Sequence, residues 1–151
     1  MKPDAECRSY IEHLHAEHRR IQRMIGDVQQ AIAAWAEAGS PHGRLDELAA
    51  RLADLQSELQ HHFIEEEAGG CLEESLSHNP SLSDDVKAAL LEHPTLLQSL
   101  AEIADRLQDP ASAKAPREVQ AMFDALATRL RMHEAAEERV LRRGFGAAAT
   151  E

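Results

Sequence analysis

Residues 45–66, LDELAARLADLQSELQHHFIEE, carry the pattern that decides the fold. Leucines recur there at alternating steps of three and four residues, which is the spacing of an apolar stripe on a helix packed in a bundle. At the end of the segment the stripe continues through His62 and Glu66 instead of further apolar residues. The pattern predicts a helix whose buried face changes from apolar to polar near residue 62.

Similar stripes run along most of the chain, in segments 4–38, 44–77, 83–108 and 117–143. Turns rich in glycine, proline, asparagine or serine separate them, at 39–43, 78–81 and 109–116. Because short connections make successive helices antiparallel neighbours, the predicted fold is an all-α, up-down-up-down antiparallel four-helix bundle.

The chain is expected to form a single domain over residues 1–151, with its core at about 4–143. Gly144-Phe145-Gly146 should end the last helix and leave a tail at 144–151. Pro94 lies inside the third segment, where we expect a kink or a local loss of backbone hydrogen bonding.

Composition narrows the classes of function. The chain has 151 residues and a formal net charge of -11, which repels nucleic acid and anionic membranes. No apolar run approaches the roughly 20 residues of a membrane span, and residues 1–6 do not resemble a signal peptide. Two cysteines do not make a disulfide scaffold. We therefore expect a cytoplasmic protein without a nucleic-acid or membrane partner.

Histidine and glutamate interrupt the apolar stripes, and every segment contributes at least one of them. The six residues are His18, His62, Glu66, His93, His133 and Glu137. Because a helix rises about 1.5 Å per residue, the distance along the sequence from a turn measures height along the bundle. His18 precedes Pro41 by nearly the same stretch of chain as separates Pro41 from His62. The same comparison across the other turns places all six within about two helical turns of one cross-section.

These six residues can be read in two ways. A histidine on an apolar stripe is commonly a hydrogen-bonded core residue, and a pair four residues apart is commonly a surface contact. An unpaired buried carboxylate or imidazole costs several kcal/mol, however. Six of them at one height need mutual compensation, and shared metal ions would supply it.

The donor types indicate which metal. Two His-x-x-x-Glu pairs, His62–Glu66 and His133–Glu137, each place both side chains on one helix face. With His18 and His93 they supply four nitrogens and two carboxylates able to bridge two ions. Mixed nitrogen and oxygen ligands with open positions suit iron or manganese better than a closed structural zinc site.

The chain resembles the hemerythrin-like (HHE cation-binding) family in four motifs. They are Glu17-His18, His62-Phe63-Ile64-Glu65-Glu66-Glu67, Glu92-His93-Pro94 and the stretch from His133 to Glu138. Their order and spacing cover about residues 10–141. The resemblance implies a non-haem centre of two oxo- or hydroxo-bridged iron ions, with manganese or zinc as substitutes. It also implies binding or sensing of dioxygen, or handling of iron or related small molecules.

Two positions depart from the oxygen-carrying members of that family. The carriers have a second histidine four residues after the one matched by His93, where this chain has Leu97. The last carboxylate, Glu137, lies four residues after His133, whereas the carriers use an aspartate five residues after. One metal is then short of a nitrogen, which argues against simple oxygen carriage. His15 is an additional candidate ligand, with a supporting or solvated role as the alternative.

Other ionisable residues are predicted to lie outside the centre. Two Glu-x-x-His motifs match ferritin-like di-iron proteins but sit beside the stripes, Glu12–His15 and Glu58–His61. Three histidines on flanks or in turns should be solvated, His13, His42 and His78. Four glutamates should form an acidic rim, in which one could hydrogen-bond a ligating imidazole, Glu65, Glu67, Glu134 and Glu138.

Cys7 and Cys71 fall near the same end of the predicted bundle, because they lie at similar distances along the sequence before and after Pro41. A redox-responsive disulfide is conceivable there. Because Gly69-Gly70 makes the local geometry unpredictable, independent free thiols are the expectation.

Three functions suit the predicted centre. The first is a protein that binds or senses dioxygen or another small diatomic or peroxide ligand, and a sensor would need a protein partner to signal. The second is a di-iron oxidoreductase acting on peroxide, oxygen or nitric oxide. The third is iron buffering. We expect a metal- or oxygen-binding protein rather than an enzyme.

Overall fold

The computed structural model describes residues 5–38, 45–109 and 116–146, and these fold almost entirely into helices. The four long helices are α1 (Ala5–Ala38), α2 (Leu45–Gly69), α4 (Ser83–Gln108) and α5 (Pro116–Phe145). A short helix, α3 (Cys71–His78), and a 3-10 turn, η1 (Pro80–Leu82), join α2 to α4. The predicted all-helical class is confirmed. Within the described ranges, none of the helices combines the length and apolar character needed to cross a membrane.

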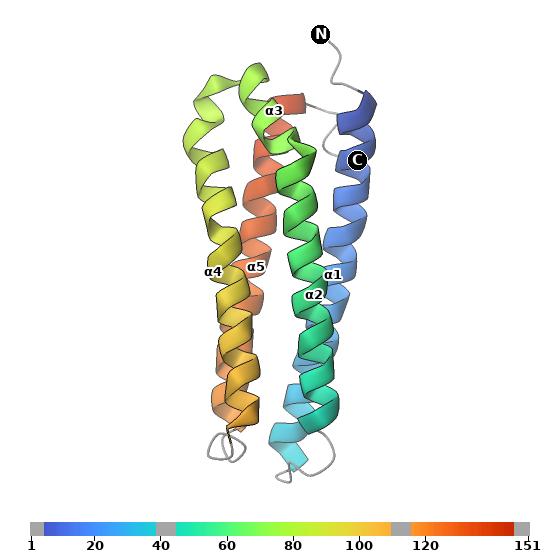
Figure 1. Cartoon of the computed structure of the whole chain (residues 1–151), viewed down its shortest axis with the longest axis vertical. Helices are drawn as coiled ribbons and strands as arrows, with labels where there is room; N and C mark the ends of the chain where they lie inside the picture. The colour runs from blue at the N-terminus through green and yellow to red at the C-terminus, as the bar shows by residue number, and fades with distance from the viewer. Residues whose placement is uncertain (1–4, 39–44, 110–115, 147–151) are drawn as a thin grey trace.

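The four long helices form an elongated bundle in which each contacts two others along its length. α1 lies against α2 and α5, and α4 lies against the same two helices (Figure 1). The start of α1, the end of α2, the start of α4 and the end of α5 share one end of the bundle, together with α3 (Figure 1). The bundle therefore brings the four predicted histidine-bearing helices around one axis.

The segment predicted as one helix over 44–77 is two helices, so the prediction of an unbroken helix is wrong at Gly70. α2 ends at Gly69, and Gly70 takes a left-handed conformation with φ 69°. A residue with a side chain is strained there, whereas glycine is not. The chain turns at this point, and α3 packs across the end of α5. The approach is close, since a Cβ at Gly144 would lie 2.6 Å from the Cβ of Ser75.

Pro94 does not interrupt α4, which runs continuously from Ser83 to Gln108. Pro94 itself is exposed, so its ring lies on the solvent side of α4, where it donates no backbone hydrogen bond to the preceding turn. The spacing predicts that the buried stripe of α4 runs through Leu90, Leu97 and Ala104, but these three residues are only half-buried. Ala89, Leu96 and Ile103 are buried, whereas Leu97 is half-buried and packs at the edge of the core.

The apolar core consists of two clusters with a polar layer between them. The larger cluster includes Ile21, Leu59, Leu96 and Leu130, and the smaller one lies at the α3 end and includes Leu14 and Val140, among others. On α1, α4 and α5 the predicted histidines lie between residues of the two clusters, and on α2 Glu66 follows the last residue of the larger cluster, Phe63. The core thus closes the layer off from above and below with apolar side chains.

Cys7 and Cys71 form a disulfide, which corrects the expectation of free thiols. Their Cα atoms lie 5.9 Å apart, a normal separation for this bond. The bend at Gly70 starts α3 at Cys71, and this turn could not be foreseen from helix periodicity. The prediction of a reducing compartment rested partly on unpaired cysteines, and the bond removes that support.

Candidate metal centre

The six predicted residues lie together in the polar layer of the bundle. α1 contributes His18, α2 contributes His62 and Glu66, α4 contributes His93, and α5 contributes His133 and Glu137. None of them is more than 4% exposed. We call these six residues the buried centre. Their convergence follows from the matched heights of the four segments, which bring the stripes to one level.

The donor atoms of the buried centre form two groups that share both carboxylates. The first group is His18, His62, Glu66 and Glu137, and the second is Glu66, His93, His133 and Glu137. Within each group one donor atom per residue lies within 4.8 Å of all the others. Each group therefore offers two nitrogens and two carboxylates, and the shared carboxylates lie between the groups.

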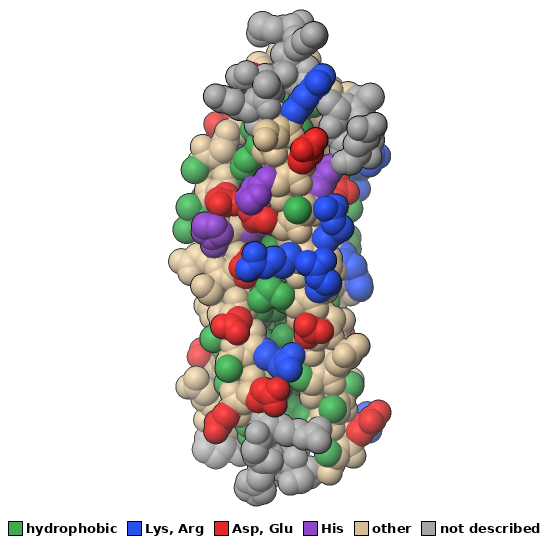
Figure 2. All heavy atoms as spheres, turned by 90° about the vertical axis from the view of Figure 1, so that its right-hand side faces the viewer, with side chains coloured by type: hydrophobic (Ala, Val, Ile, Leu, Met, Phe, Trp, Pro, Cys, Tyr) green, Lys and Arg blue, Asp and Glu red, His purple; other side chains and the backbone are tan. Residues whose placement is uncertain are grey.

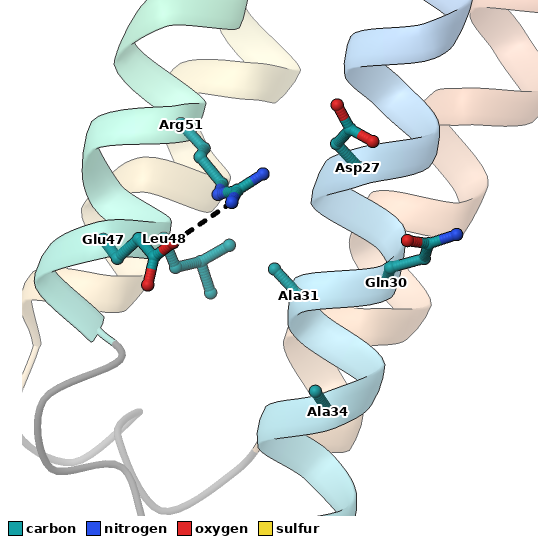
Figure 3. Close-up of a pocket in the computed structure, with 7 residues that line it drawn as sticks. All are labelled: Asp27, Gln30, Ala31, Ala34, Glu47, Leu48 and Arg51. Carbon is teal, nitrogen blue, oxygen red and sulfur yellow. Dashed lines mark hydrogen bonds and ion pairs between the residues drawn. The ribbon is translucent and has the colours of Figure 1, made fainter.

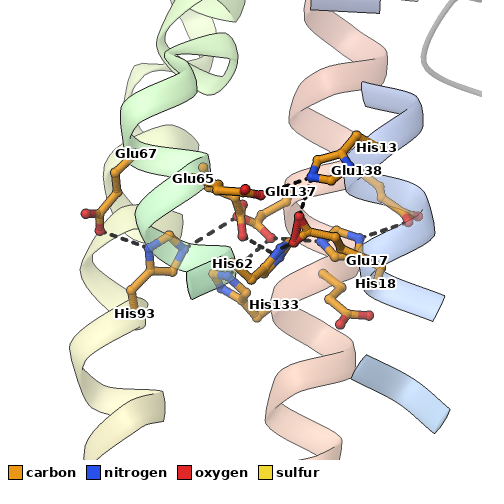
Figure 4. Close-up of polar contacts among 12 residues, drawn as sticks. His13, Glu17, His18, His62, Glu65, Glu67, His93, His133, Glu137 and Glu138 are labelled. Atoms are coloured by element: carbon orange, nitrogen blue, oxygen red, sulfur yellow. Dashed lines mark hydrogen bonds and ion pairs between the residues drawn. The ribbon is translucent and has the colours of Figure 1, made fainter. Parts of the chain in front are cut away.

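The Nε2 atom of each of the four histidines lies near a shared carboxylate, and Figure 4 shows the four imidazoles around Glu137. His62 Nε2 lies 2.6 Å from Glu66 Oε1, and His133 Nε2 lies 3.3 Å from Glu137 Oε1. His93 and His18 approach Glu137 with Nε2–O distances of 3.6 and 3.7 Å. The inner face of the layer is thus lined by imidazole nitrogens and carboxylate oxygens.

A second set of carboxylates faces the Nδ1 atoms of the same histidines. We call them the supporting carboxylates, and they are Glu17, Glu67, Glu92 and Glu138. They face His62 at 2.9 Å, His93 at 3.1 Å, His133 at 3.7 Å and His18 at 3.7 Å, respectively. Each helix supports the histidine of the next, in the order α1, α2, α4, α5 and back to α1.

The supporting carboxylates help to decide which imidazole nitrogen is free to bind a cation. Glu17 and Glu67 are hydrogen-bonded to His62 and His93. An imidazole that donates its Nδ1–H to a carboxylate presents the lone pair of Nε2 on the opposite side. This arrangement leaves Nε2 as a ligand atom directed at the layer's centre. The contacts of Glu92 and Glu138, both at 3.7 Å, are longer than a hydrogen bond.

Most inner polar atoms of the centre have no hydrogen-bond partner. They are the Nε2 atoms of all four histidines and both carboxylate oxygens of Glu66 and of Glu137. The short approach of His62 Nε2 to Glu66 is therefore not a hydrogen bond. Buried polar atoms without partners are costly. Cations placed among these lone pairs would satisfy them, so the donor set fits a two-metal site.

Burial keeps part of the centre in the form that binds cations. It lowers the pKa of His18 and of His62 to about 4, so both imidazoles are neutral at pH 7. Burial also lowers the pKa of His133, but the Glu137 and Glu92 carboxylates outweigh it and raise that pKa above its ordinary value. The Glu137 carboxylate thus favours the protonated form of the His133 imidazole, with which a cation would compete.

The two shared carboxylates differ in their protonation without metal. Burial and the nearby Glu137 raise the pKa of Glu66 well above its ordinary value. Burial would also raise the pKa of Glu137, but the Glu66 carboxyl and two imidazoles hold it well below. The shifts are opposite because two carboxylates close together in a dry core repel one another when both are ionised.

The structure does not bring His15 into either donor group. His15 is half-buried on α1, and both groups are complete without it. Among the described residues, no other nitrogen takes the place of the histidine missing at Leu97. The centre therefore has four histidines divided equally between its two groups.

The predicted acidic rim is only partly a rim. Glu67 and Glu138 face imidazoles of the centre, and half-buried Glu134 accepts a hydrogen bond from Gln22. Glu65 contacts His13 and His61 instead. Among the histidines expected to be solvated, His13 and His78 are exposed, and His42 lies outside the described residues.

Sequence reasoning missed the roles of Glu17 and Glu92. A signal was present, because each immediately precedes a histidine of the centre, as Glu67 and Glu138 each follow a shared carboxylate. Neighbouring residues on a helix point about 100° apart, so these glutamates are directed at the adjacent helix. Tyr10 was also missed. Its buried hydroxyl has no partner, and burial and Glu66 raise its pKa.

A groove between α1 and α2 lies apart from the centre. Asp27, Gln30, Ala31 and Ala34 line it from α1, and Glu47, Leu48 and Arg51 line it from α2 (Figure 3). It is near the opposite end of the bundle, beside the end of α1 and the start of α2. Arg51 is bound to Glu47 by an ion pair, and the groove has no donor in common with the centre.

Comparison with known proteins identifies one family. Residues 9–141 match the family model described as the Hemerythrin HHE cation binding domain, and this range includes every residue of the buried centre. The search of curated proteins gives no significant match. The search of solved structures gives none either.

Proposed function

The chain belongs to the hemerythrin HHE cation-binding domain family, and from this premise we propose that it binds two iron ions and, through them, dioxygen or a related small ligand. The observation that carries the proposal is the pair of overlapping donor groups sharing Glu66 and Glu137. A single cation would use one group and leave nitrogens of the other unpartnered. The up-down-up-down order of the helices is part of the proposal.

The donor chemistry favours iron over a structural zinc ion. Each group supplies two imidazole nitrogens and oxygens of two shared carboxylates. Four protein donors would complete a tetrahedral zinc site, whereas iron takes five or six ligands and keeps open positions. Iron held there would supply redox chemistry and a binding position for a small ligand.

The chain's own residues keep this position dry and oriented. Leu14 and Val140 close the layer on the α3 side, and Leu59 and Leu130 close it on the other, each no more than 2% exposed. Exclusion of water protects a reactive, oxygen-sensitive centre from side reactions. Hydrogen bonds from Glu17 and Glu67 orient the imidazoles of His62 and His93.

One observation favours an oxidoreductase as a second candidate function. Each donor group has two of the four histidines. Among the described residues, no further histidine joins either group, so each metal would keep open coordination positions. A centre with more open coordination can admit peroxide, oxygen or nitric oxide as a substrate. Sustained turnover with an added reductant would favour this function, whereas a slow, reversible ligand-bound species would favour binding or sensing.

The test is elemental analysis of protein purified without added metal, followed by optical spectra in the ferrous state before and after exposure to air. We expect two irons per chain and a new absorption band that requires oxygen. The matched control is the same protein after chelation and dialysis, which should show no band. Isolation with another metal, or with no metal that reconstitution can restore, would contradict the iron proposal.

A further inference from the structure

A second group of histidine and glutamate side chains lies on the surface of α1 and α2, beside the buried centre. His13 Nε2 lies 2.5 Å from Glu17 Oε1 and 3.0 Å from Glu65 Oε2. One donor atom from each of these three residues lies within 4.8 Å of the other two. His61 Nε2 approaches the other oxygen of Glu65 at 3.0 Å. We call these four residues the surface site.

The surface site repeats the local motif of the buried centre. His13–Glu17 on α1 and His61–Glu65 on α2 are both His-x-x-x-Glu pairs, so each pair lies on one face of its helix. The two pairs meet across the α1–α2 contact, and His13, Glu17 and Glu65 converge there (Figure 4). Histidine and acidic side chains also gather on this side of the molecule in the space-filling view (Figure 2).

Three potential ligand side chains converge on one point at the edge of the α1–α2 contact. His13 Nε2 contacts oxygens of two different carboxylates, yet an imidazole nitrogen carries one hydrogen. Glu17 is 7% exposed, so its carboxylate is directed into this contact from the buried side. Two carboxylates around one imidazole nitrogen resemble a donor set that a cation would hold together.

We propose that His13, Glu17 and Glu65, with His61, form a divalent-cation site separate from the buried centre. One imidazole nitrogen and two carboxylates converge, with the His61 imidazole beside Glu65, and such mixed nitrogen and oxygen donors suit zinc or ferrous ion. His13 and His61 have side chains that are 54% and 66% exposed, so water completes the coordination. A cation at the surface site therefore exchanges with solution more readily than one in the buried layer.

The two sites touch through one residue. Glu17 places Oε1 on His13 and Oε2 on Nδ1 of His62, so its carboxylate belongs to the surface site and also supports the buried centre. On α2 each residue of the surface site is the sequence neighbour of a residue of the buried centre: His61 precedes His62, and Glu65 precedes Glu66. The surface site thus lies against the outer side of the buried centre.

The test counts zinc ions bound by metal-free full-length protein at equilibrium dialysis, with elemental analysis as the readout. The variant is H13A/H61A, which leaves all six residues of the buried centre and both surface carboxylates in place. The control is H78A, because His78 is another exposed histidine and lies near Phe145 rather than in the site. Helical content by circular dichroism checks that every variant is folded.

We expect wild type and H78A to bind one zinc ion more per chain than H13A/H61A. The difference is independent of how many ions the buried centre holds, so it stands or falls separately from the proposed function. Equal zinc stoichiometry in all three proteins would overturn the proposal. If H13A/H61A does not fold, E65Q replaces it, since loss of one carboxylate ligand with the same shape should remove the same ion.

Discussion

Two His-x-x-x-Glu pairs on α2 differ by a shift of one residue, and their surroundings differ completely. His62 and Glu66 face the bundle axis, and His61 and Glu65 face solvent at the edge of the α1–α2 contact. The inner side chains are 2% and 0% exposed, and the outer ones are 66% and 32% exposed. The same residue types at the same spacing thus occupy two faces of one helix, about 100° apart.

The comparison teaches that burial decides what such a pair can do. The outer pair can meet its hydrogen-bonding needs with water, so it is stable with or without a cation. The inner Nε2 atoms and carboxylate oxygens are buried and have no hydrogen-bond partner, so they need either shared protons or cations. A His-x-x-x-Glu pair in the sequence therefore indicates a buried metal site only when it is known to lie on the buried face of its helix.

The largest expected difference between the pairs is in iron binding. Glu66→Ala should abolish binding of both irons, because both donor groups use Glu66. Glu65→Ala, the neighbouring change, should leave both buried irons in place. Iron content after anaerobic reconstitution, followed by removal of weakly bound metal, measures this contrast. Two irons retained by Glu66→Ala would contradict the assignment of the buried centre.

Removing the disulfide tests how much the α3 end of the bundle contributes to the stability of the fold around the buried centre. The disulfide closes a loop between cysteines with a sequence separation of 64, and loop closure of that length corresponds to about 4 kcal/mol in the chain-entropy model. Cys7→Ser with Cys71→Ser should lower the free energy of unfolding by about 2 to 4 kcal/mol, measured by chemical denaturation.

The same double variant should still bind metal in the buried centre, because neither cysteine belongs to it. Wild type treated with a reductant is the matched control and should lose a similar amount of stability. An unchanged midpoint of denaturation in both would show that the bond contributes nothing to the stability of the bundle.

The pH dependence of His62 sharpens the contrast with its exposed neighbour. Burial lowers the pKa of His62 to about 4 in the folded, metal-free protein, whereas an unfolded histidine titrates near about 6.5. The unfolded chain therefore binds more protons between these values. The contribution of neutral His62 to stability is present above pH 6.5 and is lost as the pH falls toward 4, by up to about 3 kcal/mol.

Two measurements on chelated protein check this. The imidazole NMR signals of His62 should titrate near pH 4. The free energy of unfolding should fall less between pH 6.5 and pH 4 in His62→Leu than in His61→Leu, since the latter keeps the buried imidazole. Titration of His62 near pH 6.5, or equal pH slopes in the two variants, would contradict its burial as a neutral ligand.

The sequence predicted most of what positions the centre, because both periodicity and height follow from regular helix geometry. All six residues of the buried centre converge. The stripes that the spacing predicts, from Ile11 to Trp35 on α1 and from Val119 to Val140 on α5, are buried throughout. What failed depends on irregular backbone or on contacts between helices. The bend at Gly70 and the Cys7–Cys71 bond come from a turn that helix periodicity does not describe. The roles of Glu17 and Glu92 depend on which neighbouring helix each faces.

The smallest expected effect is on the metal affinity of the buried centre, and it distinguishes a supporting carboxylate from a residue of the surface site alone. Glu17→Gln should weaken metal binding in the buried centre about 10- to 100-fold, because Glu17 holds Nδ1 of His62 at 2.9 Å. Glu65→Gln should leave that affinity unchanged, although both changes remove a surface-site ligand. Glu138→Gln should have less effect than Glu17→Gln, since Glu138 lies 3.7 Å from His18. Competition with a chelator of known affinity measures all three, and equal losses in Glu17→Gln and Glu65→Gln would show that Glu17 does not support the buried centre.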